Sequence, residues 1–167
     1  AHDYGYSASQ IGMLWLYMGA VAVVVQGWLV GRLARRLPES ALVLIGTLAL
    51  VVGFVWIPYA GAVVRLLGAL GLVIAGQGLA SPSLSSLISK TSAAHAHGEA
   101  LGIAQSLSAG ARFVGPSAGG ILLDRASVRS VFMAAAGCAA LALAATTFAT
   151  RAGTESAPDV IRMRRSG

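Results

Sequence analysis

The chain has 167 residues, of which 56% are hydrophobic and only 11% are charged, and its formal net charge is +6. A soluble domain carries about 25% charged residues, so this composition excludes an ordinary soluble fold and indicates a membrane protein. The positive charge could suggest nucleic-acid binding, but most basic residues lie in the loops between apolar segments or in the C-terminal tail, so membrane topology explains it and nucleic acid is not an expected partner.

Five apolar segments reach or approach the roughly 20 residues that a helix needs to cross a bilayer. They predict an all-α fold, a polytopic transmembrane bundle with five spans at residues 11–30, 41–60, 62–88, 101–123 and 131–150. Residues 1–10 are expected to form an external loop, and residues 151–167 a basic, disordered tail. Five spans put the two ends on opposite sides and no signal peptide is visible, so we expect this chain to be part of a longer one.

The basic residues divide between the two sides of the predicted membrane. Of the 12 Lys and Arg residues, eight fall in residues 31–40, residues 89–98 and the tail, which share one side if the spans alternate. Three others, Arg65, Arg125 and Arg129, lie at or near the opposite side. Because Lys and Arg are enriched in cytoplasmic loops, we predict a multi-pass protein of the cell membrane with a cytoplasmic C-terminus.

The first two predicted helices differ in polarity. Residues 11–30 contain Gln26 as their one strongly polar side chain, and a short basic connection, residues 31–40, follows. Residues 41–60 have only Thr47 as a polar side chain. Helices without polar side chains suit contact with lipid, whereas buried amides suit a wet cavity.

The third and fourth predicted helices contain most of the remaining polar side chains. In residues 62–88, Gln77 is followed by serines at four-residue spacing and by Pro82. In residues 101–123, Gln105, Ser108 and Arg112 share one helical face. Residues 131–150 are alanine-rich. We therefore expect the first, third and fourth helices to line a cavity, and the second and fifth to support it from outside.

Arg112 is the main candidate for a functional residue, because a charge within a membrane-length helix is costly and needs a partner. It could hold an anionic group of a substrate, or pair with a carboxylate that changes protonation. Alternatively, backbone carbonyls or an acid on a neighbouring helix could hold it in a structural role. Three amides, Gln26, Gln77 and Gln105, could bind substrate or form hydrogen bonds between helices.

Two further groups of residues have both functional and structural interpretations. Gly115, Pro116, Gly119 and Gly120 predict close helix packing and a bend, or a flexible hinge. In the loop, Gly31, Arg35 and Arg36 could form gating contacts on the cytoplasmic side, or could serve topology alone.

The sequence lacks the patterns of an enzyme. It has no Ser-His-Asp arrangement and no set of metal ligands, and Gly76-Gln77-Gly78 lies within a membrane-length segment, so it is not a dinucleotide motif. No catalytic residue, metal or other cofactor is expected. The six acids lie outside the predicted spans: Asp3, Glu39, Glu99, Asp124, Glu155 and Asp159. If protons drive the activity of this protein, the titratable acid within the membrane would therefore lie outside this chain.

Four features together resemble the C-terminal half of a major facilitator superfamily transporter, from its eighth to its twelfth helix. They are Gly31-x-Leu33-Ala34 before basic residues; Gly76-Gln77-Gly78 with Pro82; Gly102-x-x-Gln105-Ser106 followed by Arg112-x-x-Gly115-Pro116-x-x-Gly119-Gly120; and the basic tail. Arg35 stands where the family's loop motif often has Asp. The Gly-Pro-x-x-Gly-Gly run is similar to an antiporter motif usually found in the fifth helix, so an N-terminal half is the alternative interpretation.

The resemblance implies a secondary active transporter whose two six-helix halves rock about a central site. It implies as partners a small-molecule substrate, the lipid bilayer and the other half of the same transporter. The pattern is most similar to exporters of drugs or metabolites that work as proton antiporters. An uptake carrier for a metabolite or an organic anion, and a non-transporting scaffold or receptor-like relative, are the alternatives.

Overall fold

The computed structural model describes residues 8–92 and 96–155, and all of their regular structure is helical. The all-α fold class predicted from the sequence is therefore confirmed. In chain order the elements are α1 (Ala8–Val24), a π-helical segment (Val25–Leu29), α2 (Val30–Ala34), α3 (Glu39–Trp56), a short 3-10 turn (Ile57–Tyr59), α4 (Val63–Thr91), α5 (His97–Arg125) and α6 (Val128–Glu155).

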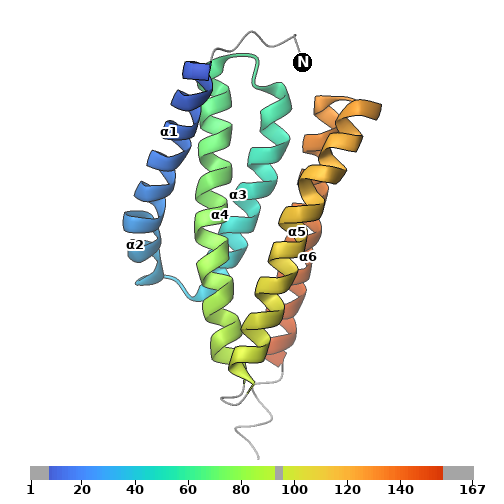
Figure 1. Cartoon of the computed structure of the whole chain (residues 1–167). Coiled ribbons are helices and arrows are strands. Elements are labelled where there is room, and N and C mark those ends of the chain that lie inside the picture. Colours follow the sequence, from blue (N-terminus) through green and yellow to red (C-terminus); the bar gives the residue numbers. More distant parts are fainter. Residues whose placement is uncertain (1–7, 93–95, 156–167) are drawn as a thin grey trace, which may run out of the picture.

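The helices run side by side and alternate in direction (Figure 1). The centre of the bundle is the pair α3 and α4, which pack closely on each other; α6 packs on α3, and α1 packs on α4. The π-helical segment and α2 continue the line of α1, so the chain passes along the bundle five times. The beginning of α1 and the end of α6 consequently lie at opposite ends.

Within the part of the chain that the structure describes, four helical stretches are long and apolar enough to cross a membrane. They are Gly12–Ala34, Glu39–Tyr59, Val63–Lys90 and Val128–Phe148. Helix α5 has 29 residues, as α4 does, but it is less apolar on average, because it contains four charged side chains where α4 contains two. The five predicted spans therefore correspond to four apolar helices and one more polar helix of the same length.

Several helices extend beyond the predicted spans. Helix α1 begins at Ala8, α4 continues to Thr91 and α5 begins at His97, so the expected loop at residues 89–98 is shorter. Helix α6 continues to Glu155, where the sequence predicted a disordered tail from Arg151. Apolar segments mark only what can lie in hydrocarbon, whereas the helical backbone continues wherever its residues allow. The predicted loop at 1–7 and tail at 156–167 lie outside the described residues.

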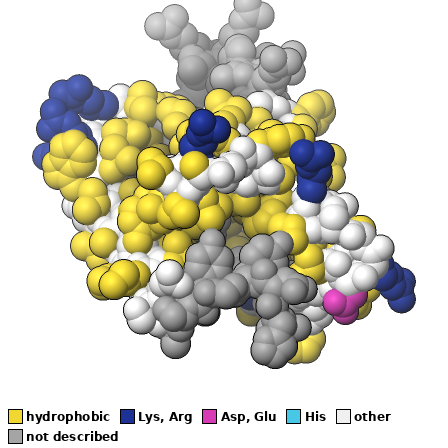
Figure 2. Space-filling view, turned by 90° about the horizontal axis from the view of Figure 1, so that it is seen from above, with side chains coloured by type: hydrophobic (Ala, Val, Ile, Leu, Met, Phe, Trp, Pro, Cys, Tyr) yellow, Lys and Arg dark blue, Asp and Glu magenta, His cyan; other side chains and the backbone are white. Residues whose placement is uncertain are grey.

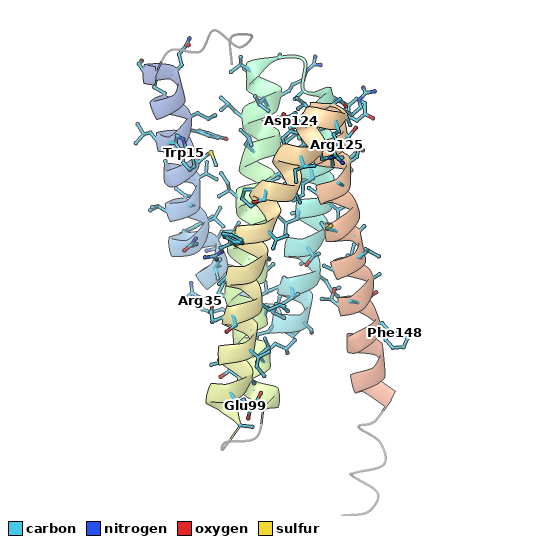
Figure 3. The ribbon with its side chains drawn as sticks, turned by 45° about the vertical axis from the view of Figure 1, so that its right-hand side comes forward. Trp15, Arg35, Glu99, Asp124, Arg125 and Phe148 are labelled. Carbon is cyan, nitrogen blue, oxygen red and sulfur yellow. The ribbon has the colours of Figure 1, made fainter. Side chains whose placement is uncertain are left out.

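Hydrophobic side chains cover much of the surface. Seen from the end of the bundle where α1 begins, hydrophobic side chains cover most of the view, and a few Lys and Arg side chains lie among them and at the edges (Figure 2). Large apolar side chains are strongly exposed on the outer helices, for example Leu16 at 74% and Phe148 at 76%, and Phe148 points away from the bundle (Figure 3). Such a surface requires lipid or another protein segment against it.

Glycines bring α3 and α4 into backbone contact. A Cβ atom added to Gly46 would lie 2.7 Å from the carbonyl oxygen of Gly76, and one added to Gly76 would lie 2.6 Å from that of Gly46. A Cβ atom on Gly53 would lie 2.5 Å from a methyl group of Val73. Small residues allow helices in membranes to approach this closely, and the close approach itself supplies the packing energy.

Two contacts fix which segments share an end of the bundle. Lys90, at the end of α4, forms an ion pair with Glu39, at the start of α3. At the opposite end the guanidinium of Arg129 lies over the ring of Tyr59, 4.7 Å from its centroid. The loop at residues 31–40 and the end of α4 therefore lie together, away from the turn between α5 and α6.

Replacing Tyr17 with phenylalanine should weaken the contact between α1 and α4 slightly. The Tyr17 hydroxyl donates a hydrogen bond to the carbonyl oxygen of Leu67 at 2.9 Å. Such bonds between membrane helices contribute about 0.6 kcal/mol on average, so thermal unfolding of the purified full-length protein should shift slightly downward. Tyr59→Phe is the control, because the Tyr59 hydroxyl bonds to no described residue. A larger shift for Tyr59→Phe than for Tyr17→Phe would contradict this assignment.

Candidate substrate cavity

A cavity of about 770 Å³ lies between the helices. It is bordered by the end of α1 with the π-helical segment, by the middle of α3, by residues 73–88 of α4 and by residues 104–112 of α5. All five residues predicted to form a substrate path line it, although they come from three helices: Gln26, Gln77, Gln105, Ser108 and Arg112. The structure thus brings together side chains that lie up to 86 positions apart in the sequence (112 − 26 = 86). Their roles in binding remain predictions.

Helix α4 contributes a polar row to the cavity. Gln77 donates from Nε2 to the hydroxyl of Ser81 at 3.4 Å, and the Ser85 hydroxyl donates to the Ser81 carbonyl oxygen at 3.2 Å. Pro82 lies in the same row, and α4 continues through it. Because proline has no N–H, the carbonyl group of Gly78, four residues earlier, loses its usual helical partner. The middle of α4 therefore presents both donors and acceptors.

Gln26 reaches the cavity from the π-helical segment Val25–Leu29. Its neighbour Val25 is buried, and a Cβ atom added to Gly78 would lie 2.9 Å from a methyl group of Val25. This glycine therefore lets the π-helical segment approach α4. A π-helical turn accommodates one extra residue and is frequent at functional sites. The apolar pattern of residues 11–30 predicts an uninterrupted helix here, and Gly27 beside Gln26 is the one local sign of an irregularity.

Helix α5 supplies the charge of the cavity. Arg112 is the only charged residue among the described residues that line it. The Ser108 hydroxyl donates to the carbonyl oxygen of Ala104 at 2.8 Å. No described residue forms an ion pair or hydrogen bond with Arg112, so the partners predicted for a structural role, a neighbouring acid or carbonyl group, are not found within the described residues.

Helix α3 lines the cavity with the apolar side chains of Leu50 and Phe54. The prediction that the second span only supports the bundle from outside is therefore wrong. Polar side chains mark a cavity helix in the sequence, whereas an apolar cavity wall cannot be told from a lipid-facing surface. None of the described side chains of α6 lines this cavity, in agreement with the outer position predicted for this helix.

The glycines of α5 do not make the predicted close contacts within the described chain. A Cβ atom added to Gly115 or Gly120 would meet no atom within 4 Å, and one added to Gly119 would meet only a Val131 methyl group, at 3.8 Å. Helix α5 runs on through Pro116 and has no buried residue. Any close packing of this face would require a segment outside the described residues.

The predicted gate residues lie at the end of α2. Gly31 is in α2, whereas Arg35 and Arg36 follow it, and all three are exposed. Figure 3 shows Arg35 at this end of the helix. The ion pair at this end instead joins Glu39 and Lys90, two residues that the sequence motifs do not indicate. Its only sequence signal was an acid within a basic loop.

Comparison with models of known protein families gave a match over nearly the whole chain. The model described as Major Facilitator Superfamily matches residues 1–165. The chain belongs to the major facilitator superfamily. The resemblance inferred from the motifs is thus confirmed at the level of the superfamily, and the protein is a membrane transporter of that group. A search of curated proteins and a search of solved structures found no match. The cavity described above is therefore the candidate substrate cavity of a major facilitator transporter.

Proposed function

We propose that this major facilitator protein moves a small solute by alternating access and exports a drug or metabolite in exchange for protons. The observation that supports it best is the cavity, which is lined by glutamine side chains from three helices and by one arginine. Polar side chains in membrane helices are costly in lipid and are retained where they face a pathway or a binding site. Transporters of this kind bind substrate between two repeats near the middle of the membrane.

A twelve-helix transporter would need its remaining helices on the side of α5 that no described helix covers. Leu107 and Phe113 are exposed at 76% and 81%, and small residues form a shallow groove along the helix beside Leu107. A smooth, apolar helix face suits another membrane helix. The motif order resembles a C-terminal half, so the N-terminal half of the same transporter is the proposed occupant.

Proton exchange requires a titratable acid within the membrane, and the described helices supply none away from their ends. The acids of the described helices lie at helix ends: Glu39, Glu99, Asp124 and Glu155. Figure 3 shows Glu99 and Asp124 at opposite ends of α5. We therefore place the coupling acid in the part of the transporter outside this chain.

Flux measurements on the full-length protein test the proposal. Vesicles loaded with a pH-sensitive dye, with the protein reconstituted, would receive candidate solutes one at a time. An exporter that exchanges solute for protons should change the internal pH only when solute is present, and a pH gradient should drive the solute uphill. Solute movement without any pH change would exclude the exchange of solute for protons. If no solute moved, the protein would more closely fit a non-transporting scaffold.

Uptake of an organic anion is the second candidate function. It is favoured by one observation, that the single charge lining the described part of the cavity is the positive charge of Arg112. The same vesicles distinguish the two functions, because the direction of net flux under a fixed pH gradient reverses between a proton antiporter and a proton symporter.

Labelling of single cysteines should show that residues 31–40 and the end of α4, which share one end of the bundle, face the cytoplasm. The turn after α5 should face the outside. Most basic residues gather at the former end, as in cytoplasmic loops. In a cysteine-free full-length protein, we expect Ala126→Cys to react with an impermeant maleimide on intact cells, and Leu37→Cys only after lysis. A protein that keeps only Cys138, within α6, should react in neither case. The reverse pattern for the first two variants would invert the orientation.

A further inference from the structure

The depth of Arg112 in the bundle bears on what the cavity binds. Gln77 is residue 15 of the 29 residues of α4, and Arg112 is residue 16 of the 29 residues of α5. The two helices are antiparallel, equal in length and joined by a short connection, so both side chains lie near mid-depth. A charge at that depth is far from either surface and cannot easily reach water outside the cavity.

Nothing in the described chain neutralises this charge. The described acids are at helix ends, and the one ion pair among described residues joins Glu39 to Lys90. Arg112 is exposed and opens onto the cavity. Its guanidinium can donate several hydrogen bonds in a planar fork, which matches a carboxylate or a similar anion.

The remaining lining suits a solute with one polar and one apolar side. Ser108 lies one turn from Arg112 on α5, about 6 Å along the axis, so a hydroxyl is close to the charge. Helix α3 contributes Leu50 and Phe54 to the lining, and α4 adds the apolar side chains of Val73 and Ile74. An anionic head at Arg112 can therefore coexist with a hydrocarbon or aromatic body against these side chains.

We infer that the cavity selects an amphipathic organic anion and that Arg112 is the residue that recognises its charge. This inference rests on the proposed transport function and narrows its substrate class. A competing source of negative charge is a carboxylate from the part of the transporter outside this chain. In that case Arg112 would already be neutralised and the cavity would show no preference for anions.

Three probes of the same shape and different charge test the inference. They are 2-naphthoate, 2-naphthamide and 2-naphthamidine, which carry charges of −1, 0 and +1 at neutral pH. Equilibrium dialysis against the purified full-length transporter would give the three dissociation constants. A hydrogen bond to a charged group predicts that naphthoate binds about tenfold or more tightly than naphthamide, with naphthamidine weakest.

Variants then assign the preference to Arg112. Arg112→Gln should abolish the preference of the cavity for naphthoate over naphthamide, and Arg112→Lys should retain part of it because the charge remains. Arg125→Gln is the matched control, since Arg125 is exposed at the end of the same helix, away from the cavity (Figure 3). The comparison of the three probes on the wild-type protein stands even if a variant fails to fold.

The possible outcomes separate this inference from the proposed function. Equal binding of the three probes, or no binding of any, overturns the anion selection, and so does a naphthoate preference that survives Arg112→Gln. A preference that depends on Arg112, without movement of naphthoate into vesicles, supports the anion site and counts against transport of such solutes. Flux of all three probes at equal rates supports transport and overturns the anion selection.

Discussion

Replacing Gly46 with leucine should leave little folded transporter. An atom added at this position would meet the Gly76 carbonyl oxygen at 2.7 Å and the Ala80 amide nitrogen at 2.8 Å. Both are backbone atoms of α4, so they cannot move aside as a side chain could. Overpacking in a well-packed core typically costs about 1–3 kcal/mol, and a backbone obstacle puts this substitution at the upper end or beyond. The fraction of monodisperse full-length protein and its unfolding temperature in detergent measure the effect.

Gly137→Leu is the matched control for that substitution. Gly137 lies within α6, is exposed and would bring an added Cβ atom within 4 Å of no other atom. It removes a helical glycine in the same way, but places the leucine toward the surroundings of the bundle. We expect the control to unfold at or above the wild-type temperature. If Gly46→Leu unfolded at the same temperature as Gly137→Leu, the backbone contact between α3 and α4 would not contribute to stability.

The position of this contact illustrates what the sequence could not reveal. Glycines are visible in the sequence of both helices, yet the Gly-Pro-x-x-Gly-Gly run favours Gly115, Gly119 and Gly120 in α5 as the packing site. In the described structure those three make little contact, whereas Gly46 and Gly76 touch. A glycine shows that a helix has a smooth site, but only the tertiary arrangement decides which helix occupies it.

The polar lining was more predictable. Gln77, Gln105 and Arg112 stand out in apolar segments because lipid cannot satisfy them, and this requirement places them toward a common interior. Apolar lining has no such signature, so Phe54 was assigned to the outside. The π-helical segment around Gln26 was also missed, since it depends on how α1 meets Gly78 of α4, a contact between distant parts of the chain.

Replacing Arg112 with alanine should abolish transport while the protein still reaches the membrane. The guanidinium opens onto the cavity and bonds to no described residue, so its removal breaks no described contact within the bundle. Removing a charge from mid-depth also removes the cost of holding it there, so the unfolding temperature should stay level or rise. Flux in vesicles, surface expression and thermal unfolding of the full-length protein together check this.

Lost flux with preserved stability would show that Arg112 binds the solute and does not serve to hold the helices together. A structural arginine, held by an acid or by carbonyl groups outside this chain, would leave those groups unsatisfied when removed, and the unfolding temperature would fall. Arg129→Ala is the control, because Arg129 contacts the Tyr59 ring at the end of the bundle, away from the cavity, and its loss should spare flux. Normal transport by Arg112→Ala would exclude Arg112 from the mechanism, and lost flux with a lowered unfolding temperature would assign it to the architecture of the bundle instead.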